Sequence, residues 1–329
     1  MEGFMYASKL KKGDEIRIVS PATSMSILSN EAKIQAKTAL ERLGYRVTVA
    51  EHANECNEFD SSSIESRVHD LHDAFFDPGV KAILTTLGGF NSNQLLRYLD
   101  YEKIKRHPKI LCGYSDITAL CNAIYRKTGL VTYSGPFFST FAMKKGLDYT
   151  EEYFLSCCAS DDPFEIHPSS EWSDDRWFLD QENRRFYPNN GPVVIQEGYA
   201  EGNLIGGNLC TLNLLQGTEY FPETEHTILL IEDDYMSDIH MFDRDLQSLI
   251  HLPAFSHVKA ILIGRFQNTS NVSMDLVKAM IETKKELSGI PIIANINAGH
   301  TSPIATFPIG GTCRIEAISG TSRIWIDKH

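Results

Sequence analysis

The chain has 329 residues, more than one hydrophobic core usually organises, so two domains of ordinary size are expected. Its composition, 42% hydrophobic and 22% charged, is typical of a soluble globular protein, and a formal charge of −12 disfavours nucleic acid as a partner. No apolar stretch approaches the roughly 20 residues of a membrane helix, and the N-terminal segment lacks the apolar core of a secretory signal. The seven cysteines are irregularly spaced without a C-x-x-C, which predicts reduced thiols in the cytoplasm and no zinc site.

The first half of the chain alternates β-branched runs with amphipathic helical patterns. Strands are predicted at Glu15–Ser20, Tyr45–Ala50, Val80–Thr85 and Ile110–Gly113. Helices are predicted at Asn30–Leu43, Ser63–Phe76, Asn93–Leu99 and Asp116–Lys127. Strands that alternate with helices pair in parallel with right-handed crossovers. Residues 1–160 are therefore expected to form an α/β domain with a doubly wound parallel sheet of the Rossmann or flavodoxin type.

The rest of the chain has a different pattern. Residues 161–190 are polar and aromatic, which predicts a linker followed by a long excursion or hairpin. Short strands separated by glycines are then predicted at Gly191–Glu197, Gly202–Gly206, Thr227–Glu232, Lys259–Gly264, Ile290–Asn295 and Arg314–Ile318, with a helix at Asp243–His251. Residues 191–329 are therefore expected to form a smaller, mixed α/β domain.

Two loops follow strands of the first half, at the edge where open parallel sheets bind their ligands. The loop around Ser115 has the strand–turn–helix pattern of a nucleophile elbow, with Gly113 permitting the tight turn and the Asp116 N–H available to an oxyanion. The last glycine of G-x-S-x-G is replaced by Ile117, so the alternative is that Ser115 only caps the following helix.

The other loop carries Gly88 and Gly89 after the third strand. Glycine lets backbone N–H groups approach a ligand closely, so this loop is a candidate for the second half of an oxyanion hole. The alternative is an ordinary turn between a strand and a helix. No G-K-S/T follows and no G-x-G-x-x-G occurs, which excludes the usual phosphate-binding loops.

A serine hydroxyl needs a base to become a nucleophile. His300 follows an apolar strand in a loop bounded by glycine and proline, which favours an imidazole facing a cleft; alternatively it hydrogen-bonds only within its own turn. His69 and His72 lie one turn apart on a predicted helix, which is typical of a solvated helix face. No H-E-x-x-H is present, which disfavours a metalloprotease.

A histidine base in turn needs an acceptor on its second ring nitrogen. The buried run Thr227–Asp234 ends in three carboxylates, and Glu232 is the first of them and the best placed to point inward. The alternative is a solvated acidic turn.

Several of these segments together resemble the LD-carboxypeptidase family of serine peptidases over nearly the whole chain. The matching motifs are L-K-K-G-D-E-I-R-I-V-S-P (Leu10–Pro21), G-Y-S-D-I-T (Gly113–Thr118), E-G-N-L-I-G-G-N-L (Glu201–Leu209), L-L-I-E-D-D (Leu229–Asp234) and A-G-H-T-S-P (Ala298–Pro303). The resemblance implies Ser115 as nucleophile, His300 as base and Glu232 as the residue that orients it. It also implies backbone oxyanion donors at Gly89 and Asp116, a homodimer, no metal and no organic cofactor.

Within that family the chain looks most like the branch that confers immunity to microcin C. The run Leu87–Leu96 stands where murein-recycling members have R-G-G-Y-G, and the insert Trp172–Trp177 and the run Leu212–Phe221 point the same way. The resemblance implies hydrolysis of the amide-type bond between an aminoacyl or peptidyl group and a nucleotide.

In this interpretation the expected substrate contacts are the glycine loop at Gly88, hydrogen bonds from Asn91 and Ser92 to a sugar or phosphate, and base stacking by Trp172 and Trp177. The alternative for the tryptophans is packing within the insert or at a dimer contact.

Two other functions compete with this interpretation. A murein tetrapeptide carboxypeptidase would use the same chemistry, but an arginine for the terminal carboxylate is expected where this chain has Leu87. A small-molecule binding module built on the same sheet would not need Ser, Glu and His at three separate strand ends.

Overall fold

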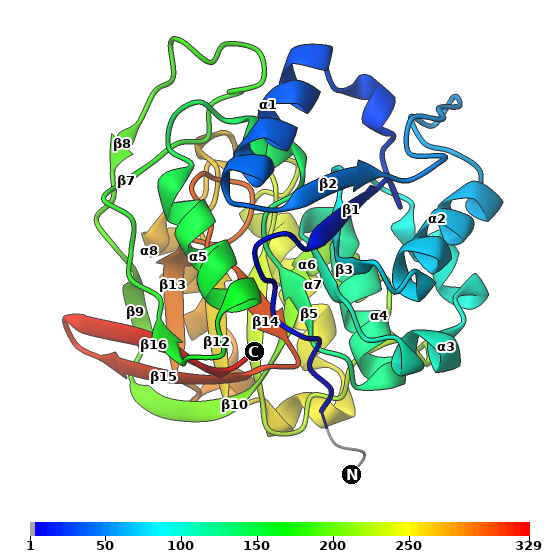
Figure 1. Ribbon diagram of the computed structural model, residues 1–329. Helices are drawn as coiled ribbons and strands as arrows, with labels where there is room; N and C mark the ends of the chain where they lie inside the picture. Colours follow the sequence, from blue (N-terminus) through cyan, green and yellow to red (C-terminus); the bar gives the residue numbers. More distant parts are fainter. Residues whose placement is uncertain (1–3) are drawn as a thin grey trace.

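The first sheet is built from the N-terminal half of the chain and one strand from near residue 308 (Figure 1). The computed structural model describes residues 4–329. Five parallel strands lie in the order β2-β1-β3-β4-β5, and β14 adds an antiparallel edge. Their bounds are β1 Glu15–Val19, β2 Arg46–Val49, β3 Val80–Thr85, β4 Ile110–Gly113, β5 Thr132–Ser134 and β14 Phe307–Ile309. This is the strand order of flavodoxin-like sheets, so the predicted fold class is confirmed.

Five α-helices belong to the same part of the chain. They are α1 (Asn30–Arg42), α2 (Ile64–Phe76), α3 (Tyr101–Arg106), α4 (Thr118–Thr128) and α5 (Asp148–Ala159). Serine hydroxyls cap α1 and α2 by accepting from backbone N–H groups in the first turn, and Gly129 ends α4 in the left-handed conformation. The helix predicted at Asn93–Leu99 is instead a 3₁₀-helix, η2 (Ser92–Tyr98).

The second sheet has eight strands in the order β6-β16-β15-β10-β11-β12-β13-β9. Their bounds are β6 Phe164–Glu165, β9 Val193–Gln196, β10 Gly198–Asn208, β11 Thr227–Glu232, β12 Ala260–Gly264, β13 Ile292–Ile296, β15 Thr312–Ile318 and β16 Thr321–Lys328. The four strands from β10 to β13 are parallel, and the flanking strands are antiparallel. The mixed character expected for this half is confirmed.

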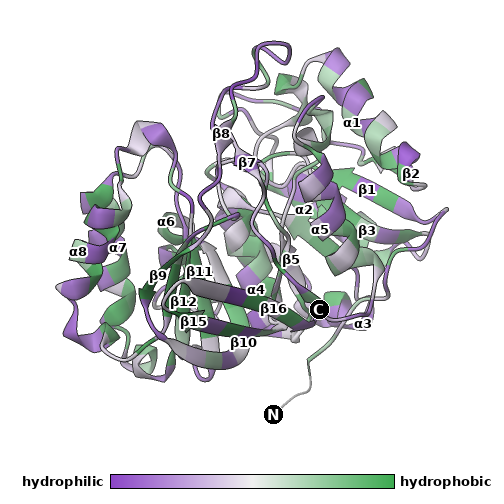
Figure 2. Ribbon diagram, turned by 90° about the vertical axis from the view of Figure 1, so that its left-hand side faces the viewer, coloured by the Kyte–Doolittle hydropathy of each residue, from purple (hydrophilic) through white to green (hydrophobic). Residues whose placement is uncertain are grey.

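Helices α6 (Leu209–Asn213), α7 (Ile239–Ile250) and α8 (Met274–Glu282) accompany the second sheet. Figure 2 shows α7 and α8 as an outer layer beside it, with hydrophilic residues on the side facing away from the strands. The inward residues of α7 are apolar and buried, including Phe242 and Leu246, as expected for an amphipathic helix.

The segment 161–190 forms a long excursion with a short hairpin, β7 (Glu171–Trp172) paired with β8 (Tyr187–Pro188). Ser173 and Ser302 exchange two backbone hydrogen bonds of 2.7 Å, so the hairpin is attached to the loop that carries His300.

Helix α4 joins the two sheets. The side-chain amide of Asn122 donates to the carbonyl of Gly206 and accepts from its N–H, at 2.9 and 3.0 Å. Gly207 lacks the Cβ that would lie 2.5 Å from Thr118 Oγ1, so β10 can approach the helix directly. The helix that follows Ser115 is thereby held against the second sheet. No helix within residues 4–329 is long and apolar enough to cross a membrane.

Candidate active site

Ser115 lies at the apex of the turn between β4 and α4. Its φ of 56° lies in the left-handed region, which costs a residue with a Cβ roughly 1–2 kcal/mol. The strand, sharp turn and helix predicted around it are all present. The helix-cap alternative is excluded, because neither the 3₁₀-turn η3 (Ser115–Ile117) nor α4 has a side-chain cap at its N-terminus.

Three distant segments bring their polar side chains into one hydrogen-bonded row. His300 Nε2 lies 2.9 Å from Ser115 Oγ, and His300 Nδ1 lies 2.8 Å from Glu232 Oε2. Ser115 follows β4, Glu232 ends β11 and His300 follows β13, so the row joins the carboxyl ends of strands in both sheets. The Glu232 side chain is 3% exposed and that of His300 17%, so the pair is shielded from water. The solvated-turn alternative for Glu232 is therefore excluded.

The electrostatics favour a charged imidazole. Burial lowers the pKa of His300, but the charge and the hydrogen bond of Glu232 outweigh it and raise the pKa above its ordinary value, with Asp234 and Asp233 acting in the same direction. The carboxylate therefore stabilises the imidazolium that forms when His300 takes a proton from Ser115.

The glycine loop lies directly against the nucleophile. A Cβ on Gly88 would lie 2.9 Å from Ser115 Cβ, and one on Gly89 would lie 2.7 Å from Thr23 Oγ1. Gly89 also has a φ of 155°, at the edge of the range that favours glycine. Within residues 4–329, the N–H groups of Gly89 and Asp116 donate to no protein acceptor, so both are available to a bound oxyanion.

Ser92 and Asn91 have structural partners. Ser92 is fully buried, its N–H donates to Asp116 Oδ2 at 2.8 Å, and its hydroxyl donates to the Asp116 carbonyl at 2.7 Å. Ser92 thus ties the glycine loop to the nucleophile turn and has no free face for a sugar. Asn91 Oδ1 accepts from the buried Arg67 at 2.9 Å, and Asn91 lines a cavity of about 660 Å³.

Neither tryptophan of the insert is among the residues that line that cavity. Trp172 packs 5.1 Å from the Tyr187 ring and 5.2 Å from the Arg265 guanidinium, and it lines a separate cavity of about 350 Å³. Trp177 is half-buried against the core and meets Phe178 edge to face. The structure therefore does not place Trp172 and Asn91 in one of these cavities, and Trp172 packs both on Tyr187 within the insert and against Arg265 outside it.

Two residues beside the row were not identified from the sequence. Tyr114 stacks on Phe137 at 4.1 Å and meets the His300 ring edge-on at 5.2 Å, which fixes the imidazole plane. Asp233 is 3% exposed, and burial, followed by the charge of Glu232, raises its pKa to about 6. The run of three carboxylates was a signal for Asp233, but it could not show that two of them turn inward.

Comparison with known proteins identifies the class. Residues 16–135 match the LD-carboxypeptidase N-terminal domain, and residues 201–315 match the LD-carboxypeptidase C-terminal domain. The chain therefore belongs to the LD-carboxypeptidase family, which is a family of peptidases.

Individual relatives carry three different descriptions. The chain is 98% identical over 325 residues to the putative carboxypeptidase YocD of Bacillus subtilis, covering 99% of this chain and 100% of the relative. It is 29% identical to the microcin C7 self-immunity protein MccF of Escherichia coli, over 95% of this chain and 93% of the relative. It is also 30% identical to a probable murein peptide carboxypeptidase of Bacillus subtilis, over 96% of this chain and 92% of the relative.

Solved structures agree with the fold. An MccF-like protein from Bacillus anthracis matches with a TM-score of 0.98 and 55% identity over 99% of this chain and 100% of that one. MccF in complex with glutamyl sulfamoyl guanosine matches with a TM-score of 0.88 and 29% identity over 98% of both chains.

Proposed function

We propose that this protein is a cytoplasmic, homodimeric serine carboxypeptidase or amidase that hydrolyses the amide-type bond of aminoacyl- or peptidyl-nucleotide antibiotics. The observation that carries the proposal is the row from Ser115 Oγ through the His300 ring to Glu232 Oε2, with distances of 2.9 and 2.8 Å. A nucleophile, a base and an orienting carboxylate in hydrogen-bond contact are the geometry of a serine hydrolase triad.

In the first half of the reaction, Ser115 Oγ attacks the scissile carbonyl while His300 Nε2 takes its proton. Glu232 keeps the imidazole oriented and balances its charge. The backbone N–H groups of Gly89 and Asp116 stabilise the oxyanion of the tetrahedral intermediate, a contribution of roughly 10²–10³ in rate per donor. His300 then protonates the leaving nitrogen, and an acyl-Ser115 remains.

In the second half, His300 takes a proton from water, and the resulting hydroxide attacks the acyl group. The second tetrahedral intermediate uses the same two N–H donors. It collapses to release the carboxylic acid and returns the proton to Ser115 Oγ, so every residue ends in its starting state.

The nucleotide part of the proposal rests on similarity. The MccF structures that this chain resembles contain glutamyl sulfamoyl guanosine, aspartyl sulfamoyl adenosine or adenosine monophosphate. Asn91 and the half-buried Trp177 are the proposed contacts to the nucleotide, and Ser92 is proposed to position the glycine loop rather than to bind a ligand.

A murein tetrapeptide LD-carboxypeptidase is the second candidate. The probable murein peptide carboxypeptidase with 30% identity favours it. The apolar Leu87 opposes it, because this side chain offers no positive charge to a terminal carboxylate at that position of the glycine loop.

One experiment separates the candidates. The protein is incubated with an aminoacyl-sulfamoyl adenosine and, in parallel, with a murein tetrapeptide, and the products are identified by mass spectrometry. We expect the free amino acid and sulfamoyl adenosine from the first substrate, no product from the Ser115→Ala variant, and slower release of D-alanine from the second. Cleavage of the tetrapeptide alone would replace the proposed substrate class, and cleavage of neither would reject both.

A further inference from the structure

Two histidines and a glutamate gather where β2 meets α2. Glu51 and His52 follow β2 after one intervening residue, and His69 lies on α2. One potential ligand atom from each of the three lies within 4.8 Å of the other two. Strand β2 is the edge of the first sheet, and β1 and β3 separate it from β4, which leads into Ser115. The cluster is therefore independent of the hydrogen-bonded row.

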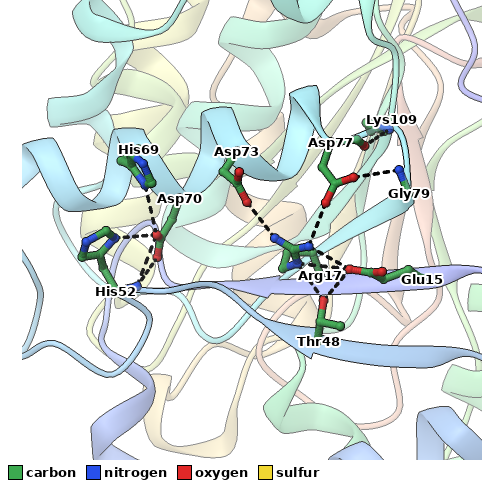
Figure 3. Close-up of polar contacts among 10 residues, drawn as sticks. All are labelled: Glu15, Arg17, Thr48, His52, His69, Asp70, Asp73, Asp77, Gly79 and Lys109. Carbon is green, nitrogen blue, oxygen red and sulfur yellow. Dashed lines mark hydrogen bonds and ion pairs between the residues drawn. The ribbon is translucent and has the colours of Figure 1, made fainter.

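The His52 ring is fixed by a carboxylate behind it (Figure 3). Its Nδ1 lies 2.7 Å from Oδ1 of the buried Asp70, whose two oxygens also accept from the His52 backbone N–H at 3.2 and 3.0 Å. Because Nδ1 donates to this carboxylate, the lone pair of the neutral ring is on Nε2. A carboxylate on the far nitrogen is the usual support of a metal-binding histidine, since it sets the tautomer and makes the ring a better donor of electrons.

The surroundings are negatively charged. The hydrogen bond to Asp70 raises the pKa of His52 against a smaller effect of burial, and the charges of Glu55 and Glu51 raise it further. Within residues 4–329, neither Glu51 nor Glu55 forms an ion pair with a lysine or arginine. The negative charges of the Glu51 and Glu55 carboxylates also attract a divalent cation.

The other two side chains are largely exposed, and His69 Nδ1 also lies 3.8 Å from Asp70 Oδ1 (Figure 3). The His69 ring lies 5.1 Å from that of His52 at 86°, and its side chain is 59% exposed. Glu51 is also exposed. Ligand atoms about 2.0–2.1 Å from a tetrahedral ion lie roughly 3.4 Å apart. The two exposed side chains therefore have to shorten separations of up to 4.8 Å to this value when an ion binds.

We propose that Glu51, His52 and His69 bind a divalent transition-metal ion, with Zn²⁺ as the best match, water as the fourth ligand and Asp70 supporting His52. Two imidazoles and one carboxylate suit zinc and its neighbours better than Mg²⁺ or Ca²⁺, which prefer oxygen ligands. The ion would join the end of β2 to α2. His69, which the sequence places on a solvated helix face, thereby acquires a role outside the hydrolytic reaction.

Titration calorimetry with ZnCl₂ at pH 7.5 tests the site on the full chain. We expect one tight site in the unmodified protein and at least tenfold weaker binding in His69→Ala and in Glu51→Gln. The matched control is His167→Ala, which removes a 70% exposed imidazole whose Nδ1 lies 3.9 Å from Glu165 but which belongs to no such cluster within residues 4–329. The control should bind as the unmodified protein does.

A second readout separates this site from adventitious binding at His300. Co²⁺ bound by imidazole gives visible absorption bands, and we expect these bands to disappear in His69→Ala while hydrolysis by that variant is unchanged. Absence of a tight Zn²⁺ site in the unmodified protein would overturn the proposal. Equal affinity and unaltered Co²⁺ bands in both His69→Ala and Glu51→Gln would also overturn it, because the ion would then lie elsewhere.

Discussion

Ser115 combines a strained backbone with a hydroxyl that is already hydrogen-bonded to a base. Its φ of 56° directs Oγ toward His300 Nε2, and the Cβ-free Gly88 leaves room for it. Strained residues of this kind persist only where the surrounding structure fixes them. Here the buried Ser92–Asp116 pair provides that support.

The strain predicts that two substitutions of Ser115 abolish activity alike but differ in stability. Both Ser115→Ala and Ser115→Gly should reduce kcat by about 10³-fold or more, because the nucleophile is absent. The free energy of unfolding of Ser115→Gly should be about 1 kcal/mol higher than that of Ser115→Ala, because glycine adopts positive φ without steric cost. Urea denaturation of the two variants measures the difference. A less stable glycine variant would show that the turn is not strained.

The raised pKa of His300 predicts the pH dependence of hydrolysis. The neutral ring is the base, so kcat/KM should rise with pH through an apparent pKa above about 6.5, the ordinary histidine value. Glu232→Gln removes the charge that raises this pKa, so the profile should shift to lower pH while its plateau falls about 10²–10⁴-fold. An unshifted profile in this variant would mean that Glu232 does not control the protonation of His300.

Motifs predicted some residues of the site and could not predict others. Ser115, Glu232 and His300 each lie in a short run with distinctive neighbours, and the structure brings exactly these side chains into contact. The positions of Ser92 and Trp172 depend on long-range packing against Asp116 and Arg265, which no local pattern encodes.

Among the elements, the excursion 161–190 contains an arginine that adds to the backbone hydrogen bonds between Ser173 and Ser302. The Arg184 side chain is 1% exposed, and its Nε donates to both oxygens of Asp175 at 2.7 and 2.9 Å. Its two Nη atoms reach the Lys145 carbonyl and Ser302 Oγ. Ser302 lies two residues beyond His300, so this contact extends the support of the excursion to the base.

Arg184→Ala should therefore loosen the excursion without unfolding the sheets. Breaking a buried, hydrogen-bonded ion pair costs about 3–5 kcal/mol, which we expect to appear as local opening. Cleavage within 171–190 by a trace of protease should accelerate at least tenfold, and KM for the nucleotide substrate should rise. Arg185→Ala, which removes an exposed neighbour, is the control. Equal cleavage rates of the two variants would contradict this role.

Elements with a clear period were predictable, and edge elements were not. Strands β1 to β4 and helices α1 and α2 match their predicted ranges closely, because the strands are short runs rich in β-branched and other apolar residues and serines mark the helix starts. Strand β10 runs from Gly198 to Asn208, twice the predicted length, because glycines that suggested breaks are instead close approaches to α4 and β11. The three-residue strands β5 and β14 are too short for a periodic signal.

For the whole molecule, stability depends on an acidic group buried at the carboxyl end of strands β10 and β11. Asp233 follows Glu232, is buried, and accepts a hydrogen bond from the Asn208 amide at 3.1 Å. Burial raises its pKa to about 6, from a usual aspartate value of about 3.9. At pH values between these two pKa values, the native protein therefore binds more protons at Asp233 than the unfolded chain does. Its stability falls as the pH rises through that range.

Asp233→Asn should remove the loss of stability at high pH, because the asparagine amide is uncharged at every pH. At pH 8 the variant should unfold with a free energy about 1–3 kcal/mol above that of the unmodified protein, and the difference should shrink toward pH 4.5. Urea denaturation at both pH values measures it, with the less buried Asp234→Asn as control. A constant difference between the two pH values would show that Asp233 does not titrate in this window.

Strand β14 has a consequence for how the protein is made. It follows the His300 loop along the chain, yet it pairs with β5 in the sheet that carries the serine. While the ribosome is still producing the second half, β5 has an unfilled edge, which is a place where a nascent chain can pair wrongly. This edge can pair with β14 only after residue 309 has left the ribosome, and by then His300 has been synthesised as well. The newly synthesised chain thus covers the exposed edge of β5 and brings His300 to Ser115 at nearly the same stage of synthesis.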